Sequence, residues 1–145
     1  MGEPDPIIIK QLLAELRDVN KDKRRTAVMK LGMMGGEQAL RALMYAVQND
    51  YEDLIVRGRA ALMLGKIGDP RAVDPLIRAL DAPGYQTPLN AAQALGKIGD
   101  RRAIAPLLTL AEKGRDKTRD AALEALVKLG HNGEETEEPE PIGMV

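Results

Sequence analysis

Apolar positions of the chain recur with the period of an α-helix, most clearly between residues 69 and 81. Four of them follow the spacing i, i+3, i+4 and i+7: Val73, Leu76, Ile77 and Leu80. That spacing is typical of a helix that buries one face. Asp69 suits the N-cap and Pro70 suits the first helical position. Pro75 lacks an amide donor, so we expect a bend one turn into this helix, and Pro106 predicts the same bend in the next unit.

A second helix is predicted after the break at residues 81–84. Thr87 and Pro88 can cap its start, and Gly99 can supply the left-handed residue that ends it. Other glycines stand inside the predicted second helices, near their ends: Gly32, Gly65 and Gly96. Because glycine costs a helix roughly 0.5–1 kcal/mol relative to alanine, we expect the next helix to approach closely at these positions. Val127 takes this position in the last unit, where no further unit has to fit.

This two-helix unit is repeated along the chain. The hexapeptide Leu-Gly-Lys-Ile-Gly-Asp occurs at residues 64–69 and again at 95–100. Aligning the remaining sequence on it predicts one domain, residues 1–130, of four units at about 5–35, 36–68, 69–99 and 100–130. Helices of this length are marginally stable alone, so each unit is expected to be stabilised by stacking on its neighbours.

The repeated pattern resembles a known family. It reads Val-Arg-x-x-Ala-Ala-x-x-Leu-Gly-x-Ile-Gly-Asp-x-x-Ala-Val-x-Pro-Leu from Val56 to Leu76, and it is similar to the short HEAT-like repeats of the phycobilisome-lyase type. The third unit departs from it, because Pro88 stands in the column that elsewhere holds Arg24, Arg57 and Arg119. The resemblance implies an all-α, right-handed α-solenoid of four helix pairs, about eight helices. It also implies that second helices line the concave face and that protein binding is the commonest function.

Composition restricts the classes of function. The chain has 145 residues, a net charge of −1, no cysteine and a single histidine, His131. The lack of cysteine excludes thiol nucleophiles, disulfides and zinc–thiolate sites and fits a reducing compartment. No apolar run approaches the roughly 18 residues that span a membrane, and the start lacks the pattern of a signal peptide. We therefore expect a cytoplasmic protein that is not an enzyme and needs no metal or cofactor.

Charge is distributed unevenly. Residues 131–145 contain five glutamates and no lysine or arginine, which leaves residues 1–130 with a net charge of +4. This acidic segment has the composition of a disordered tail, although Ile142, Met144 and Val145 are apolar. We hypothesise that it docks on the groove of its own chain or of a second copy, which would permit self-association. A free, solubilising tail is the alternative.

The resemblance also indicates which positions face the concave side. The middle of that face is predicted to be apolar with a cationic rim, and nine residues are expected to contact a partner: Arg25, Met29, Leu54, Ile55, Arg59, Leu62, Tyr85, Leu89 and Lys97. Such a strip suits an acidic, amphipathic peptide or helix. The alternative is that several of these residues belong to the core. We predict a non-catalytic scaffold that binds a protein or peptide.

Two other functions stay open. Basic residues cluster at 21–25 and 113–119 and could contact nucleic-acid phosphates, but a pI near 5.9 and only three aromatic residues argue against this. The chain could also be the accessory subunit of an enzyme such as a HEAT-like lyase. For the arginine column the resemblance implies a structural role, in which the guanidinium groups bind acidic or carbonyl groups of neighbouring turns. Asp18 and Asp53 are near enough in sequence to serve as acidic partners.

Overall fold

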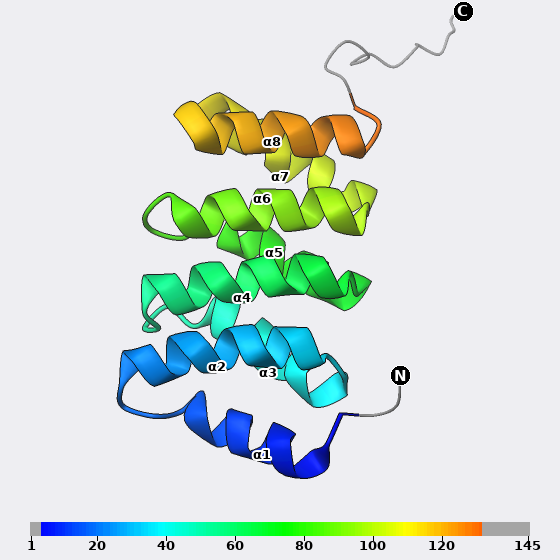
Figure 1. Cartoon of the computed structure of the whole chain (residues 1–145). Helices are drawn as coiled ribbons and strands as arrows, with labels where there is room; N and C mark the ends of the chain where they lie inside the picture. The colour runs from blue at the N-terminus through cyan, green and yellow to red at the C-terminus, as the bar shows by residue number, and fades with distance from the viewer. Residues whose placement is uncertain (1–3, 132–145) are drawn as a thin grey trace, which may run out of the picture.

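The computed structural model describes residues 4–131, which form two layers of stacked helices (Figure 1). The first helices are α1 (Pro6–Glu15), α3 (Glu37–Gln48), α5 (Val73–Ala79) and α7 (Ile104–Lys113). The second helices are α2 (Lys21–Met34), α4 (Leu54–Ile67), α6 (Gln86–Ile98) and α8 (Asp116–Lys128). Short 3-10 turns, η1 (Pro70–Ala72) and η2 (Arg101–Ala103), precede α5 and α7. All regular structure in this range is helical, so the predicted α-solenoid of four helix pairs is confirmed.

The second helices stack directly on one another, and glycine makes their close approach possible. A β-carbon placed on Gly65 would lie 2.8 Å from the Cα atom of Ala94 in α6, and one placed on Gly96 would lie 3.0 Å from the Cα atom of Ala125 in α8. At Gly32 the added atom would overlap the side chain of Met63. The close approach expected at these glycines is therefore confirmed.

The two layers differ in how closely neighbouring repeats approach. Second helices contact the next second helix along much of their length, whereas first helices of successive repeats touch one another far less. In a curved stack the layer with the closer spacing lies on the inside. The second helices therefore form the concave side of the solenoid, and we call the surface that they present the second-helix face.

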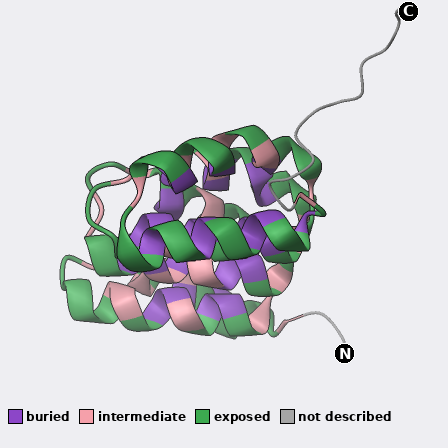
Figure 2. Ribbon diagram, turned by 90° about the horizontal axis from the view of Figure 1, so that it is seen from above, coloured by how far each residue is buried: buried purple, intermediate pink, exposed green. Residues whose placement is uncertain are grey.

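The core between the layers is aliphatic. Figure 2 shows buried turns where the two layers meet and exposed turns on the outside. The largest fully buried side chains include Leu31, Leu43, Met63, Leu64, Leu76 and Leu95. The tyrosines lie outside this core, with exposed fractions of 70% for Tyr45, 97% for Tyr51 and 62% for Tyr85. Stability therefore depends on close packing of small and branched side chains, without aromatic rings.

The start of the first helices differs from the sequence prediction. The single helix expected from Pro70 is divided into η1 and α5, so the break comes at Val73 and lies ahead of Pro75. Pro75 thus occupies the first turn of α5, where a backbone N–H has no intrahelical partner in any case. Pro106 has the same place in α7, behind η2. The predicted bend at these prolines is therefore replaced by a change of helix type before them.

The caps of the third repeat agree with the prediction at one end and differ at the other. Asp69 accepts a hydrogen bond from the backbone N–H of Arg71 at 2.9 Å, and Gly99 ends α6 with a left-handed φ of 83°. The helix α6 already begins at Gln86, so the prediction that Thr87 caps it is wrong. Thr87 instead donates from Oγ1 to the carbonyl of Leu54 at 3.4 Å, because its side chain faces α4.

The arginine column fixes the connection between the two helices of a repeat. Arg57 is 3% exposed and donates from Nε and Nη2 to the carbonyl of Val47, at 3.3 and 3.2 Å. Arg119 donates from Nη1 to the carbonyl of Ala111 at 2.8 Å, and Arg24 binds the turn after α1 in the same way. These guanidinium groups bind carbonyls at or just after the ends of first helices, as the structural interpretation predicted. The carboxylates of Asp18 and Asp53 bind Lys23 and Arg25 instead of the column.

The glycine spacing can be tested with two substitutions on the same helix. Gly65→Ala places a β-carbon against the backbone of α6 and is expected to destabilise the chain by about 1–3 kcal/mol through overpacking. Gly58→Ala adds only ordinary contacts, the nearest at 3.4 Å, and is expected to be neutral or to stabilise by up to about 1 kcal/mol through helix propensity. Urea unfolding followed by circular dichroism measures both. Equal effects of the two substitutions would contradict the role assigned to Gly65.

Candidate functional site

The nine residues predicted to contact a partner all belong to the second-helix layer. Arg25 and Met29 lie on α2; Leu54, Ile55, Arg59 and Leu62 on α4; Tyr85 directly before α6; and Leu89 and Lys97 on α6. Three of the apolar members are exposed, by 44% for Leu54, 42% for Ile55 and 62% for Tyr85. The other three are half-buried and pack against the main core: Met29, Leu62 and Leu89. The strip therefore combines exposed apolar groups with side chains that also support the core.

Arg25 is held by an ion pair that the sequence analysis did not foresee. Its Nε and Nη2 atoms donate to the two carboxylate oxygens of Asp53 at 2.8 and 2.9 Å. Asp53 is also the N-cap of α4, where it accepts from the backbone N–H groups of Ile55 and Val56 at 3.1 Å each. Arg25 therefore joins α2 to the start of α4, and its charge is largely neutralised within the chain.

The same contacts lower the pKa of the Asp53 carboxyl group. The hydrogen bond from Arg25, supported by the backbone N–H groups of Val56 and Ile55, lowers the pKa of Asp53 from 3.8 to about 2, against the opposing effect of burial. The carboxylate is thus more stable in the folded chain than in the unfolded one. Arg59 adds a further link, because its Nη1 atom donates to the carbonyl of Arg25 at 3.1 Å. Of the three cations among the nine predicted contact residues, Lys97 is exposed, whereas Arg25 and Arg59 are half-buried.

The buried side-chain amide of Asn90 joins α6 to α4 beneath the predicted contact residues. Asn90 is 7% exposed and donates from Nδ2 to the carbonyl of Gly58 at 2.8 Å, while its Oδ1 atom accepts from Gln86 at 2.9 Å. The sequence predicted that Asn90 belongs to a helix but gave no reason to pair it with Gly58, which lies 32 positions earlier. This contact joins α4, which begins with the exposed Leu54 and Ile55, to α6, which the exposed Tyr85 directly precedes.

Three of the four basic residues of the first cluster, at residues 21–25, are paired with acidic groups. Arg24 binds Glu52 through Nη2 at 3.0 Å, and the Nζ atom of Lys23 lies 3.8 Å from a carboxylate oxygen of Asp18. Arg25 is held by Asp53, as described above. A phosphate backbone would have to displace these carboxylates, so the structure weakens the interpretation of this cluster as a nucleic-acid surface.

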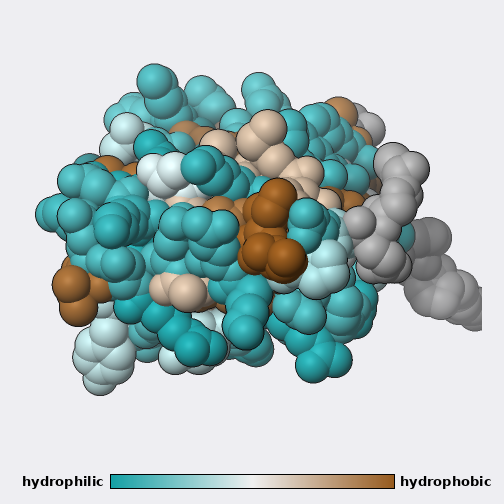
Figure 3. Space-filling view, turned by 60° about the horizontal axis from the view of Figure 1, so that its bottom comes forward, coloured by the Kyte–Doolittle hydropathy of each residue, from teal (hydrophilic) through white to brown (hydrophobic). Residues whose placement is uncertain are grey.

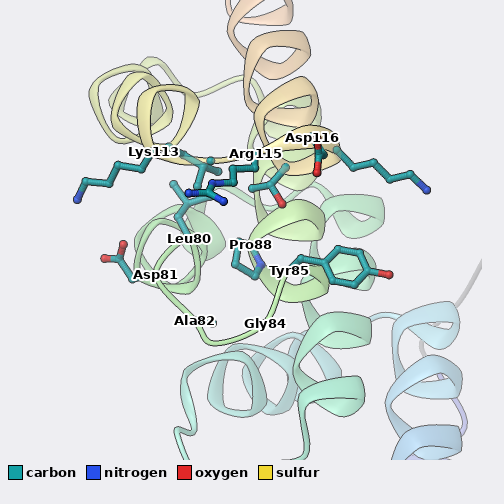
Figure 4. A pocket seen from close by; sticks show the side chains of 13 residues that line it. Leu80, Asp81, Ala82, Gly84, Tyr85, Pro88, Lys113, Arg115 and Asp116 are labelled. Carbon is teal, nitrogen blue, oxygen red and sulfur yellow. The ribbon is translucent and has the colours of Figure 1, made fainter.

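The second basic cluster borders a hollow between the third and fourth repeats. Leu80 and Pro88 lie beneath Lys113 and Arg115 in Figure 4, with Asp81 on one side and Asp116 above. The hollow has a volume of about 730 Å³. Its lysines and arginine are thus accompanied by two aspartates, and the surface does not form a concentrated basic stripe.

A larger hollow, of about 920 Å³, lies on the side of the first helices. Its lining includes Leu13 of α1, Val19 of the following turn, Tyr45 of α3 and Tyr51 of the turn before α4. The sequence does not reveal this surface, because the two turns meet only when the first two repeats stack. The exposed aromatic rings at residues 45 and 51 were the one signal in the sequence.

Neither a metal site nor a membrane span is found in residues 4–131. No three histidine or acidic side chains in that range lie close enough together to bind a metal ion. None of its helices has the length and apolar character needed to cross a bilayer.

The ion pair between Arg25 and Asp53 predicts a pH-dependent contribution to stability. Asp53→Asn keeps an N-cap acceptor but removes the charge, and it is expected to cost about 1–2 kcal/mol near neutral pH. Because the pKa is about 2 in the folded chain and 3.8 when unperturbed, the stabilisation is present above the higher value and is lost as the pH falls toward the lower one. The difference in Tm between wild type and variant should therefore shrink on acidification, as differential scanning calorimetry would show.

Asp53→Ala provides the comparison for this experiment. It removes the cap together with the charge and should cost about 1 kcal/mol more than Asp53→Asn at every pH. A Tm difference between wild type and Asp53→Asn that does not change with pH would contradict the assigned ion pair.

Comparison with known structures supports the solenoid. The chain has a TM-score of 0.73 and 28% identity to the CpcE–CpcF complex of phycocyanin lyase from a Nostoc species, covering 84% of this chain and 53% of that one. Human deoxyhypusine hydroxylase gives a TM-score of 0.72 and 25% identity, over 90% of this chain and 45% of the other. An engineered protein shares the fold, with a TM-score of 0.62 and 18% identity over 84% of this chain and 62% of that one.

The chain thus spans about half the length of the two natural proteins that it resembles in structure. None of the curated proteins matches its sequence. The family of HEAT repeats matches residues 9–87 and again residues 76–137, and these two matches together cover most of the sequence. The repeated helix pairs, the stacked second helices and this match lead to one conclusion: the chain belongs to the HEAT-repeat family.

Proposed function

We propose that the chain is a non-catalytic scaffold that binds a protein or peptide on the second-helix face. The observation that carries this proposal is a patch of exposed apolar side chains on adjacent helices. Leu54 and Ile55 begin α4, and Tyr85 directly precedes α6. A β-carbon placed on Gly84 would lie 3.5 Å from a methyl group of Leu54, so the start of α4 lies beside the turn that carries Tyr85.

The chemistry of this patch favours an amphipathic segment. Tyrosine is enriched among the residues that dominate binding energy at protein interfaces, and the exposed leucine and isoleucine side chains add apolar area that a partner can bury. Lys97, which is exposed, is the cation that favours an acidic residue in the partner. Arg25 and Arg59 contribute less direct attraction than the sequence suggested, because Asp53 and a backbone carbonyl already bind them. Met29, Leu62 and Leu89 complete the apolar floor.

The structural comparisons support a protein partner in general terms. The similar lyase structure is a complex of two proteins, CpcE and CpcF. A role as accessory subunit of an enzyme is therefore a specific form of the same proposal, and co-purification with a catalytic subunit would identify it. The cytoplasm remains the expected compartment, on the basis of the cysteine-free sequence.

The binding face can be tested with paired charge substitutions. Peptides selected from a displayed random library against the wild-type chain serve as probes, and fluorescence anisotropy measures their Kd. The double variant Leu54→Glu, Ile55→Glu is expected to weaken binding about tenfold or more, because it removes two apolar anchors. Both side chains are more than two-fifths exposed, so the fold should be retained, as circular dichroism would verify.

Leu108→Glu is the matched control. Leu108 is 40% exposed on α7, in the layer of first helices, and its substitution should leave peptide affinity unchanged. Equal loss of affinity in both variants would contradict the proposed face. Binding of a labelled DNA duplex with an affinity that falls steeply with salt would instead support the nucleic-acid alternative.

A further inference from the structure

Three lysines occupy equivalent positions at the ends of successive second helices. Lys66, Lys97 and Lys128 are exposed and stand in the last turns of α4, α6 and α8. The C-terminal ends of the second helices lie along one side of the stack (Figure 1). The equivalent position of α2 holds Met33, which is 75% exposed. We call these four positions the lysine edge; it changes from cationic to apolar toward the first repeat.

The charges of the lysine edge have no acidic partner in the described part of the chain. Carboxylates near the helix ends are taken by the arginines of the two 3-10 turns: Arg71 pairs with Asp69 and Glu37 at 3.0 Å each, and Arg102 with Asp100 at 2.8 Å. No lysine of the edge has a carboxylate oxygen of residues 4–131 within 4.0 Å. The helix dipole favours a lysine at each of these ends, but it leaves the three ammonium groups free for a ligand.

An apolar hollow adjoins the methionine end of the lysine edge. It has a volume of about 440 Å³, and its lining includes Ile8 and Leu12 of α1 together with Met33 and Met34 of α2. Figure 3 shows hydrophobic side chains gathered in the middle of this end of the molecule, surrounded by hydrophilic ones. A ligand that follows the edge would therefore meet three positive charges and then an apolar site.

The sequence after the described residues has acidic residues followed by apolar ones, which matches the three lysines and the apolar hollow. Every third residue from 134 to 140 is acidic, and apolar residues follow: Glu134, Glu137 and Glu140, then Ile142 and Met144. Prolines at 139 and 141 favour the polyproline II helix. That helix has three residues per turn, so glutamates three apart point in one direction at a spacing of about 9 Å. Packed helices lie about 8–10 Å apart, which is the expected spacing of the lysines.

We propose that residues 134–144 bind along the lysine edge of their own chain. Glu134, Glu137 and Glu140 pair with Lys128, Lys97 and Lys66 in that order, and Ile142 and Met144 enter the hollow beside Met33. The described chain ends at His131, three residues after Lys128, so the segment starts at the correct end of the edge. Three helix-to-helix steps measure about 24–30 Å, and nine residues of polyproline II span about 28 Å.

Because residues 134–144 are covalently attached to the repeats, individually weak ion pairs are enough to hold them at the lysine edge. Exposed ion pairs contribute little individually, but a short connection gives the segment a millimolar effective concentration at its site. The contact does not depend on the proposed function and shares only Lys97 with the nine residues predicted to contact a partner. Where both ligands are present, the segment would compete with an acidic partner for that lysine.

Spin labels on the full-length chain test the proposal and its direction. Because the sequence has no cysteine, Thr136→Cys and Val145→Cys each give a single site for a nitroxide outside the proposed contacts. The label at 145 should broaden the amide signals at the end of α2, and the label at 136 should broaden those at the ends of α6 and α8. Raising the salt to about 1 M, where the Debye length is near 3 Å, should restore the signals.

Paired substitutions in the labelled Val145→Cys chain distinguish the proposed pairing of particular glutamates from a general effect of negative charge. Glu134→Gln with Glu137→Gln should lower the docked-to-free ratio about threefold or more, because two pairs are lost. Glu135→Gln with Glu138→Gln removes the same charge from another side of the segment and should change the ratio little. Lys66→Glu with Lys97→Glu should abolish docking, whereas Lys113→Glu with Lys117→Glu, away from the edge, should retain it.

Three results would overturn the proposal. The first is that neither label broadens signals near the lysine edge. The second is that both glutamate pairs have the same effect. The third is that broadening appears in a mixture of spin-labelled and separate isotope-labelled chains, which would assign the contact to a second copy. None of these readouts involves an external peptide, so failure here is separate from failure of the second-helix face.

Discussion

The close contact between successive second helices is the constraint on which the rest of this solenoid depends. At Gly65 and Gly96 the absence of a side chain lets the next helix approach until its backbone occupies the space of a β-carbon. A helix interior disfavours glycine, so the stability of the array must come from the contact that glycine permits. This contact draws the second helices together on one side, sets the inside of the curve and leaves the first helices further apart.

A stack of this kind also needs each repeat to hold its own turn in place. The arginines of the column do so by donating to carbonyls at the ends of first helices, as Arg57 does with Val47 and Arg119 with Ala111. Arg25 and Asp53 extend the same principle between repeats, because one carboxylate both caps α4 and binds α2. Basic residues near the starts of the second helices therefore serve mainly to join backbone segments. Fewer of them are free to bind a ligand than the composition suggests.

The surfaces that remain follow from what stacking leaves uncovered. On the second-helix face, Leu54, Ile55 and Tyr85 are exposed because they lie at the starts of helices, beyond the close contact made by the glycines. At the opposite ends of the second helices, Lys66, Lys97 and Lys128 form a row because the last three repeats each carry a lysine at the same position. A repeat architecture thus converts a single position of the repeat into a line of equivalent groups across the protein.

The sequence by itself determined the helix pairs, their number and the glycine positions where they stack, because all three follow from periodicities that neighbouring residues impose locally. It also indicated that the column of Arg24, Arg57 and Arg119 is structural. Only the tertiary structure decided how Pro75 is accommodated, since the 3-10 turn η1 ends before it and Pro75 lies in the first turn of α5. Pairs such as Arg25 with Asp53, and Asn90 with Gly58, join residues 28 and 32 positions apart. Whether a lysine or arginine is free or paired depends on which side chains the stacked repeats bring within hydrogen-bond distance. The order of residues along the chain does not contain those distances.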